Sequence, residues 1–332
     1  ASEISYRSIT LLIFVSCLDD LLGTDHESLN AELSEMYPDV HFITCHMNPF
    51  KMDTKVPPAV GLQVSIFGNQ FKENLPKKDQ INMIGNNAYV DPRCELYELI
   101  NKAGYSIHHL GLCKTYEEYL QMQYSKLNLV LHPAGGIASQ KMEINAGIKM
   151  QTALNTYDPD EIELIYHQIE ENLEIKMDDF SANKESAIES IKRAKKIIGD
   201  YPIAIDYQSV LKPFTLGRLL VKYGFNVQLI FCDGVAAFDK DACQWLLENV
   251  PSLIVVEALH PDSVKFENKM PECLCIGFSG GYLTKSFHVV DLMEDEYLYG
   301  FWGTDQLMAK MIYAFQNVTD VNQIIAGAKL VV

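Results

Sequence analysis

The sequence predicts an α/β protein built from three Rossmann-like units, whose mostly parallel sheets are flanked by helices. Two patterns support this prediction. Short runs of β-branched residues alternate with helical patterns almost from end to end of the 332 residues, which is typical of parallel-sheet domains. Several expected strands are nearly all apolar, as strands are when helices cover both faces of a sheet. Because the chain is too long for one core, we divide it into units at residues 1–78, 79–176 and 177–332.

The first unit contains two expected strands and one helix. The strands cover residues 9–17 and 40–45, and the helix between them covers residues 25–36. Residues 46–78 follow, and they are rich in proline and have no clear period. This composition predicts a long connection without regular structure.

The second unit alternates strands with helices more clearly. We expect strands at residues 80–84, 105–110, 127–132 and 148–154, and helices at residues 92–103, 115–124, 137–147 and 159–173. Gly104 is placed to terminate the first of these helices. Thr115 and Glu118 are spaced as in a capping box, which predicts the start of the second helix.

The third unit has a similar plan, so units two and three look like two copies of one arrangement. Its expected strands are residues 202–205, 227–232, 252–256 and 274–277, and its helices are residues 181–198, 214–223, 241–249 and 304–317. In such sheets ligands bind where loops converge at the carboxyl ends of the strands. We therefore look for function in the residues that directly follow each strand.

The charge of the chain argues against nucleic acid as a partner. Its 27 Lys and Arg residues are outnumbered by 44 Asp and Glu residues, which gives a net charge of −17, whereas binding to phosphates requires clustered cations. The one basic cluster, residues 192–196, lies in a helical pattern that also carries Glu185 and Glu189. That pattern is typical of a solvated helix face.

The sequence predicts a cytoplasmic protein without a membrane anchor. No apolar run approaches the roughly 18 residues that a membrane helix requires, and eight cysteines are too few for a disulfide scaffold. The alternative is a lipoprotein signal in residues 9–15 that ends at Cys17, but Glu3 and the acidic pair after Cys17 argue against it. The sequence begins at Ala1 rather than at a methionine, as is expected of a processed or shortened chain.

Cys17 is the first candidate for a metal site. It ends an apolar strand near helix N-termini, and a thiolate in that position suits a soft metal or an Fe–S cluster. A cysteine at a strand end is also a common core residue, so both interpretations stay open. Cys273 and Cys275 share one face of a strand, yet no second pair accompanies them, and packing in the core explains them better.

His132 is the second candidate. It follows the apolar residues 127–131 and precedes Gly135 and Gly136, which let the backbone approach a ligand closely. A helix that begins near Ile137 would point its free N–H groups at the same place. The alternative is a capped turn whose histidine is already hydrogen-bonded.

Familiar catalytic motifs are absent from the sequence. It contains no G-x-G-x-x-G, P-loop, G-x-S-x-G or H-E-x-x-H motif, and no cysteine pairs with zinc-finger spacing. The chain therefore does not resemble a nucleotide hydrolase, a serine hydrolase or a zinc protease. Two glycines within residues 278–281 follow a strand and could receive an anion, although this signal is weak.

Several short segments, taken in order, resemble nitrogenase component 1-like proteins. These segments are residues 14–25 (FVSCLDDLLGTD), 80–85 (QINMIG), 96–110, 125–130 (SKLNLV) and 299–305 (YGFWGTD). The first is similar to the family's segment around its third cluster cysteine, which Cys17 matches. The last is similar to the Gly-rich turn before the family's final helix. The resemblance spans essentially the whole chain, and the ordered succession of segments carries the weight.

The resemblance implies a subunit of a two-component reductase. Members of the family carry an Fe–S cluster and receive single electrons from a separate ATP-hydrolysing iron protein, which fits the absence of a P-loop here. An identical or homologous partner subunit and a second metal cofactor of unknown type are implied as well. By this resemblance Cys17 ligates the Fe–S cluster, and Gly135, Gly136 and Trp302 line a cofactor or substrate cavity. His132 is then a metal ligand or a catalytic proton donor.

Two departures from the family pattern limit what is carried over. Nothing here matches the two earlier cluster cysteines, because the sequence starts sixteen residues before Cys17. The cysteine that holds the large cofactor in nitrogenase α-type subunits is replaced by His132, and the family's cofactor histidine falls near Trp302. These positions therefore differ from a nitrogenase-type cofactor site, although imidazole also ligates iron.

Three functions stay open at this point. The first is an electron-accepting subunit of a nitrogenase-like reductase. The second is a non-catalytic scaffold that assembles or carries a metal cofactor for another enzyme. The third is a binding protein for a metal chelate or corrinoid, in which the helix at residues 181–198 joins two Rossmann-like lobes.

Overall fold

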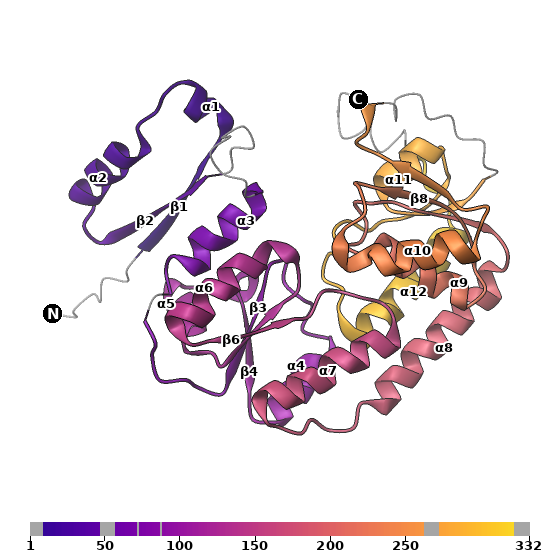
Figure 1. Ribbon diagram of the computed structural model, residues 1–332, viewed down its shortest axis with the longest axis horizontal. Coiled ribbons are helices and arrows are strands. Elements are labelled where there is room, and N and C mark those ends of the chain that lie inside the picture. The colour runs from indigo at the N-terminus through magenta and orange to yellow at the C-terminus, as the bar shows by residue number, and fades with distance from the viewer. Residues whose placement is uncertain (1–8, 47–56, 72, 87, 262–271, 322–332) are drawn as a thin grey trace. The chain divides into compact units, whose positions relative to one another are not determined.

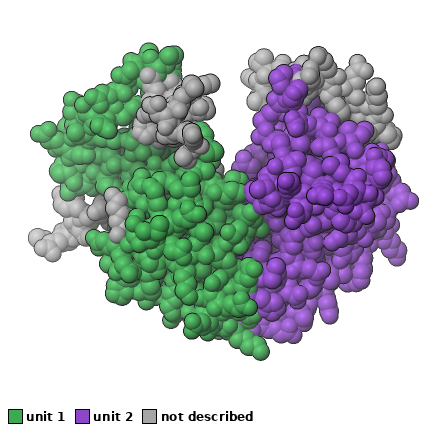
Figure 2. Space-filling model, viewed as in Figure 1, with its two compact units in different colours: residues 1–89, 100–154, 168–176 green, residues 90–99, 155–167, 177–332 purple. Residues whose placement is uncertain are grey.

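The computed structural model describes residues 9–46, 57–71, 73–86, 88–261 and 272–321, and it confirms the predicted α/β class (Figure 1). All strand pairs in these residues are parallel. The chain forms two compact units, which differ from the three units expected from the sequence. From here on, the first unit is the one that Figure 2 colours green (residues 1–89, 100–154 and 168–176), and the second unit is the purple one (residues 90–99, 155–167 and 177–332). The three-domain division drawn from the sequence stays a prediction. No helix in the described ranges is long and apolar enough to cross a membrane.

A two-stranded sheet begins the first unit. It pairs β1 (Ile9–Val15) with β2 (Val40–His46), and α1 (Cys17–Leu21) and α2 (His26–Met36) lie between them in the chain. The expected strand reached Cys17, but the structure ends it at Val15. The reason is that the Asp19 carboxylate accepts the Ser16 N–H at 2.9 Å and starts α1 there. Asp25 caps α2 close to its expected start.

A four-stranded sheet follows, in the order β4-β3-β5-β6. Its strands and the elements around them are β3 (Gln80–Ile84), α4 (Glu95–Lys102), β4 (Ser106–His109), η2 (Leu110–Leu112), α5 (Tyr116–Gln121), η3 (Met122–Tyr124), β5 (Leu127–Val130), η4 (Pro133–Gly135), α6 (Gly136–Ala146), β6 (Lys149–Thr152) and α7 (Pro159–Leu173). The helices α4 and α7 contribute residues to both units. Thr115 Oγ1 accepts the Glu118 N–H at 3.2 Å, which confirms the predicted start of α5.

The connection between β2 and β3 is helical where the sequence predicted no regular structure. It contains α3 (Pro58–Gln63) and the π-helix η1 (Val64–Gly68). Ile66, Phe67 and Phe71 are buried in one core with residues of α6. The apolar stretch is too short to reveal a period, so only its packing identifies it as helix. The prediction of no regular structure is therefore wrong for residues 58–68, and residues 47–56 lie outside the described residues.

The second unit is built on a five-stranded sheet in the order β11-β10-β7-β8-β9. Its elements are α8 (Ser181–Ile198), β7 (Pro202–Ile205), α9 (Pro213–Lys222), β8 (Asn226–Cys232), η5 (Ala237–Asp239), α10 (Lys240–Asn249), β9 (Ile254–Glu257), β10 (Leu274–Ile276), α11 (Phe278–Thr284), β11 (His288–Val290) and α12 (Gly300–Gln316). The helix α8 packs against α12. Cys273 and Cys275 are buried in the core, as predicted.

The helix α11 and the strand β11 were not predicted from the sequence. β11 has only three residues, too few for a period. The Gly-rich residues of α11 resemble a turn, yet they pack directly on the sheet. A Cβ on Gly281 would lie 2.6 Å from Val289 Cγ2, and one on Gly280 would lie 2.8 Å from Cys275 Sγ. Glycine is present here because the helix lies too close to the strands for a side chain.

Both larger sheets change the direction of their strand order at one point. In the first unit β3 lies between β4 and β5, and in the second unit β7 lies between β8 and β10. Successive connections leave the sheet on opposite faces there, so the loops separate and can open a crevice for a ligand. The strand ends at these two switch points are therefore the first places to look for a site.

Candidate functional site

The switch point of the four-stranded sheet brings together residues that the sequence singled out. β3 and β5 end side by side, and the Leu131 N–H donates to Ile84 O at 2.9 Å. Directly beyond, Gly85 has φ +109° and meets the backbone of His132, because a Cβ on Gly85 would lie 2.5 Å from His132 O. A Cβ on Gly135 would lie 2.9 Å from Gly85 Cα. The two strand ends can approach this closely only because both positions are glycine.

The ring of His132 is oriented by the turn that follows it. Its Nδ1 accepts the Ala134 N–H at 3.1 Å and caps η4. A neutral imidazole that accepts at Nδ1 carries its proton on Nε2. This orientation offers a hydrogen-bond donor and leaves no lone pair on Nε2. Both predicted roles of His132 stay predictions: a metal bound at Nε2 requires the other tautomer, and proton donation requires an imidazolium, which gives up the Nδ1 acceptor.

Gly136 begins α6 with helical dihedral angles, φ −60° and ψ −52°. In the described part of the chain, no atom other than those of its two sequence neighbours and of its own helix backbone lies within 4 Å of the position that its Cβ would take. Neither the backbone conformation nor the packing therefore requires glycine here. Open space beside the first amides of an eleven-residue helix suits the approach of an anionic group. The predicted cofactor-binding role of Gly136 stays a prediction.

Cys17 is the first residue of α1, just beyond the carboxyl end of β1, and its side chain lies outside the described residues. The other seven cysteines have described side chains, and all but Cys113 are buried. Burial raises the pKa of the Cys45 thiol, which disfavours the thiolate that a metal requires. In the described part of the chain, no group of three or more His, Cys, Asp or Glu residues could hold a metal ion. The described residues therefore do not form a complete cluster site.

In the second unit, Trp302 lies in the first turn of α12 rather than in a turn before it, which corrects the prediction. The buried Glu95 carboxylate accepts the Phe301 N–H at 2.8 Å and the Trp302 N–H at 2.9 Å. It thereby pairs with amides that the helix leaves free. The Tyr166 hydroxyl donates to the same carboxylate at 2.5 Å. The Arg93 guanidinium lies 5.0 Å from the centre of the Trp302 ring.

The switch point of the five-stranded sheet holds a carboxylate of the chain itself. Asp206 directly follows β7 and is 1% exposed, and it accepts the Gly280 N–H at 3.0 Å and the Gln208 N–H at 3.2 Å. Burial raises the pKa of the Asp206 carboxyl, although these donors act in the opposite direction. The weak anion site expected at residues 278–281 is thus part of α11, and the anion beside it is Asp206.

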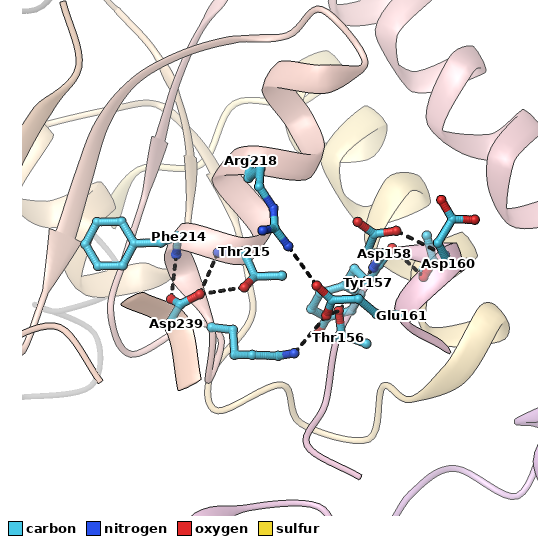
Figure 3. Close-up of polar contacts among 11 residues, drawn as sticks. Thr156, Tyr157, Asp158, Asp160, Glu161, Phe214, Thr215, Arg218 and Asp239 are labelled. Carbon is cyan, nitrogen blue, oxygen red and sulfur yellow. Dashed lines mark hydrogen bonds and ion pairs between the residues drawn. The ribbon is translucent and has the colours of Figure 1, made fainter. Parts of the chain in front are cut away.

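A further set of charges in this unit joins the start of α7 to α9 (Figure 3). The Glu161 carboxylate accepts from Lys212 Nζ at 3.0 Å, from Arg218 Nη2 at 2.8 Å and from Thr156 Oγ1 at 2.8 Å. Burial alone would raise the pKa of Glu161, but the two cations and the threonine outweigh burial and lower it. Asp239 accepts two N–H groups of the first turn of α9, each at 2.8 Å. The ion pairs of Glu161 hold the start of α7 against α9, and Asp239 caps the first turn of α9.

The structure groups His132 with the two glycines beside it in the first unit and places Trp302 in the second. Sequence reasoning missed Glu95 and Asp206. A usable signal existed for Asp206, because it is a charged residue directly after an apolar strand. No local signal could have found Glu95, because the amides that it binds lie 206 and 207 positions later in the chain.

Comparisons with known proteins agree with this fold. The sequence model of nitrogenase component 1 type oxidoreductases matches residues 4–316. A solved structure of nitrogenase Cp1 at pH 6.5 matches with a TM-score of 0.69 and 14% identity, covering 96% of this chain and 76% of that chain. A second, of nitrogenase Cp1 at pH 5, has a TM-score of 0.63 and 15% identity, covering 92% and 70%. A search of curated protein sequences finds no match.

Structures at 14% and 15% identity establish the fold alone. The match to the family's sequence model is stronger evidence, because it runs through nearly the whole chain and includes the segments that resemble the family. This chain belongs to the nitrogenase component 1 type oxidoreductase family.

Proposed function

We propose that the chain is a subunit of a two-component reductase. It accepts single electrons from a separate ATP-hydrolysing iron protein and acts with an identical or homologous subunit to reduce a substrate or cofactor. Family membership supports the oxidoreductase class. The absence of a P-loop supports a separate protein as the site of ATP hydrolysis.

The observation that carries the proposal is the position of Cys17. It starts α1 at the carboxyl end of a parallel strand, and it matches a cluster cysteine of the family. An Fe–S cluster would supply the storage and transfer of single electrons. We assign only Cys17 to the cluster, because the described residues contain no complete ligand set. We assign no other residue to the cluster.

His132 is the proposed proton donor. Reduction generally consumes protons along with electrons, so such a site requires a group that can donate them. With Nδ1 accepting the Ala134 N–H, Nε2 of the neutral ring is a hydrogen-bond donor. To donate a proton, the ring must first be protonated at Nδ1, which breaks this cap. The close contact between Gly85 and the His132 backbone holds the backbone of His132 in place.

Iron content of the anaerobically purified full chain, alone and with any partner subunit, tests the cluster. We expect stoichiometric iron and acid-labile sulfide in the wild type and loss of both in Cys17→Ser. Cys113→Ser is the matched control, because Cys113 is the one partly exposed cysteine with a described side chain. Iron that is absent from every preparation, or unchanged in Cys17→Ser, would refute the proposal.

His132→Asn separates the donor role from the capping role. The Asn Oδ1 can replace Nδ1 as the acceptor for the Ala134 N–H, because asparagine is a good capping residue, but Asn has no counterpart of Nε2–H at that position. We expect iron content and thermal stability to stay near wild type while the rate of substrate reduction falls at least about tenfold. An unchanged rate would show that His132 only caps the turn.

A further inference from the structure

The two-stranded sheet at residues 9–46, called the β1–β2 lobe from here on, leaves one edge of β1 open (Figure 1). In the described part of the chain, β1 pairs with β2 and with no other strand. β1 has the sequence ITLLIFV, which contains no charged residue and no proline. Natural sheets commonly place such residues on exposed edges, where they prevent another strand from pairing. The open edge of β1 therefore has the composition of a strand that is paired on both sides.

Apolar side chains are exposed around this edge. On β1, Phe14 is 54% exposed and Leu11 is 50% exposed. The helix α2 contains no buried residue. The other large apolar residues that the lobe exposes include Leu18, Leu21, Leu22 and Leu29. Parallel sheets are normally covered on both faces, and large exposed apolar patches mark sites of interaction with other proteins. The lobe therefore has the surface of an interaction site.

The two faces of the lobe differ. Asn30 of α2 donates a hydrogen bond to Thr44 Oγ1 on β2, and Thr44 lies beside Ile13 in the register of the sheet. The helix α2 therefore covers the face to which Thr44 and Ile13 point. Phe14 is the next residue of β1, so its side chain points to the opposite face. A strand added beside β1 would have α2 on one face and Phe14 on the other.

The charge of the lobe decides which partner fits the α2 face. Residues 9–46 contain seven Asp and Glu residues and no Lys or Arg, and Glu27, Glu32 and Glu35 are exposed on α2. A second copy of the chain would bring its own carboxylates to the same surface, and like charges oppose such a contact. A segment with Lys or Arg on the α2 face and apolar residues on the other face would be attracted.

We propose that the open edge of β1 binds an extended segment of a different protein, in which apolar residues alternate with Lys or Arg. Alternate residues of a strand point to opposite faces, so this pattern places cations beside α2 and apolar side chains beside Phe14. Main-chain hydrogen bonds along β1 supply affinity, and the side chains supply selectivity. The proposal goes beyond the reductase function and does not depend on Cys17 or on bound iron.

A labelled peptide tests this chemistry. The fluorescein-labelled peptide KVKVTVKVK is titrated with the iron-free full chain, and fluorescence anisotropy at constant ionic strength follows binding. We expect saturable binding. Phe14→Thr and Leu11→Thr should each weaken it at least about fivefold, because apolar contact area is lost while the preference for strand is kept. Either variant alone keeps the test valid if the other folds poorly. Ile144→Thr on α6, at a position that is 82% exposed, is the matched control and should bind as the wild type does.

Two further peptides and a charge variant separate strand pairing from attraction by charge alone. KVKVPVKVK has the charge of the probe but lacks the central N–H, and EVEVTVEVE has the opposite charge, so neither should bind saturably. Glu27→Gln together with Glu35→Gln should weaken binding of the basic peptide at least about threefold. Glu143→Gln together with Glu185→Gln removes the same charge from exposed positions outside the lobe and should leave binding unchanged.

Sedimentation velocity of the chain alone tests a second copy as the occupant. A self-association that Phe14→Thr abolishes would show that a second copy covers β1, and it would overturn the proposal. No binding by the wild type would overturn it as well. So would equal binding of KVKVPVKVK, or wild-type affinity in both Phe14→Thr and Leu11→Thr, because attraction by net charge alone would then explain the result.

Discussion

Replacing Glu95 should destabilise the second unit strongly, although Glu95 forms no ion pair in the described structure. The side chain is 8% exposed and accepts hydrogen bonds from Phe301 N, Trp302 N and Tyr166 Oη. In Glu95→Gln one oxygen becomes an NH2 group, so at least one buried donor loses its acceptor. Such a loss costs about 2–3 kcal/mol where the acceptor was charged. Glu95→Ala leaves all three donors unpaired, and we expect a cost of about 4–5 kcal/mol.

Urea unfolding measures this cost, with two single-tryptophan backgrounds as reporters. Trp302 lies in the turn that Glu95 caps, and Trp245 lies on α10 of the same unit. Glu185→Gln is the control, because Glu185 is an exposed carboxylate on α8. Thermal unfolding should show Glu95→Gln about 5–10 °C below this control, taking 2–4 °C for each kcal/mol. If only the first turn of α12 frays, Trp302 should change at lower urea concentrations than Trp245.

A loss of less than about 0.5 kcal/mol in Glu95→Gln would refute the reasoning, because that is the range of ordinary surface substitutions. It would mean that water or another acceptor can replace the carboxylate, and that the first turn of α12 does not depend on Glu95. A large loss reported equally by both tryptophans would instead show that the cap belongs to the cooperative core of the unit.

Three more predictions follow from buried groups. Burial raises the pKa of Asp295 to about 6, above its value of about 4 in the unfolded chain. Protonation of Asp295 therefore stabilises the fold. This stability is fully present below about pH 4 and is lost as pH rises through about 6. In urea titrations, the wild type should lose about 2–3 kcal/mol relative to Asp295→Asn over this interval, and parallel pH profiles would contradict this. The lowered pKa of Glu161 acts in the opposite direction, so Glu161→Gln should cost about 1–2 kcal/mol at pH 7, with the difference vanishing as pH falls below about 4. Gly85→Ala should cost about 3 kcal/mol in thermal unfolding, because a Cβ would meet His132 O at 2.5 Å, and a cost below about 1 kcal/mol would show that the strand ends separate easily.

Elements with local signals were predicted within about four residues at each end, and two helices were predicted with the bounds that the structure shows. These are α7 (Pro159–Leu173) and α8 (Ser181–Ile198). Proline is favoured at the start of a helix, and Gly199, at φ +64°, ends α8. The elements η1 and α11 were missed because their identity depends on packing against distant residues. The segment of η1 is short and that of α11 contains two glycines, so each has the local pattern of a loop.

The residues of the candidate site also divide into those with a local signal in the sequence and those without one. His132 and Asp206 lie just beyond strand ends, so the topology rule points to both, although the sequence analysis used it for His132, Cys17 and residues 278–281 and not for Asp206. The orientation of the His132 ring depends on the Ala134 amide, which lies two positions away. Glu95 gave no signal, because its partners come from other segments of the chain. Pairing between distant positions is decided by the fold and cannot be read from spacing.

The two adjacent glycines of the switch point can be tested against each other, because only one of them is explained by packing. A Cβ on Gly135 would lie 2.9 Å from Gly85 Cα, so Gly135→Ala should destabilise the first unit. Gly136 is helical and has open space at its Cβ position, so Gly136→Ala should stabilise the protein by about 0.5–1 kcal/mol in urea unfolding.

A protein that gains stability from Gly136→Ala has no structural need for glycine there. The decisive measurement is then the rate of substrate reduction by the stabilised variant, relative to the wild type at equal iron content. A rate reduced at least about tenfold would mean that the methyl group occupies space that a ligand requires, as expected for backbone that must approach a cofactor or substrate. An unchanged rate would remove Gly136 from the site and leave His132 as the residue at this switch point with a chemical role to test.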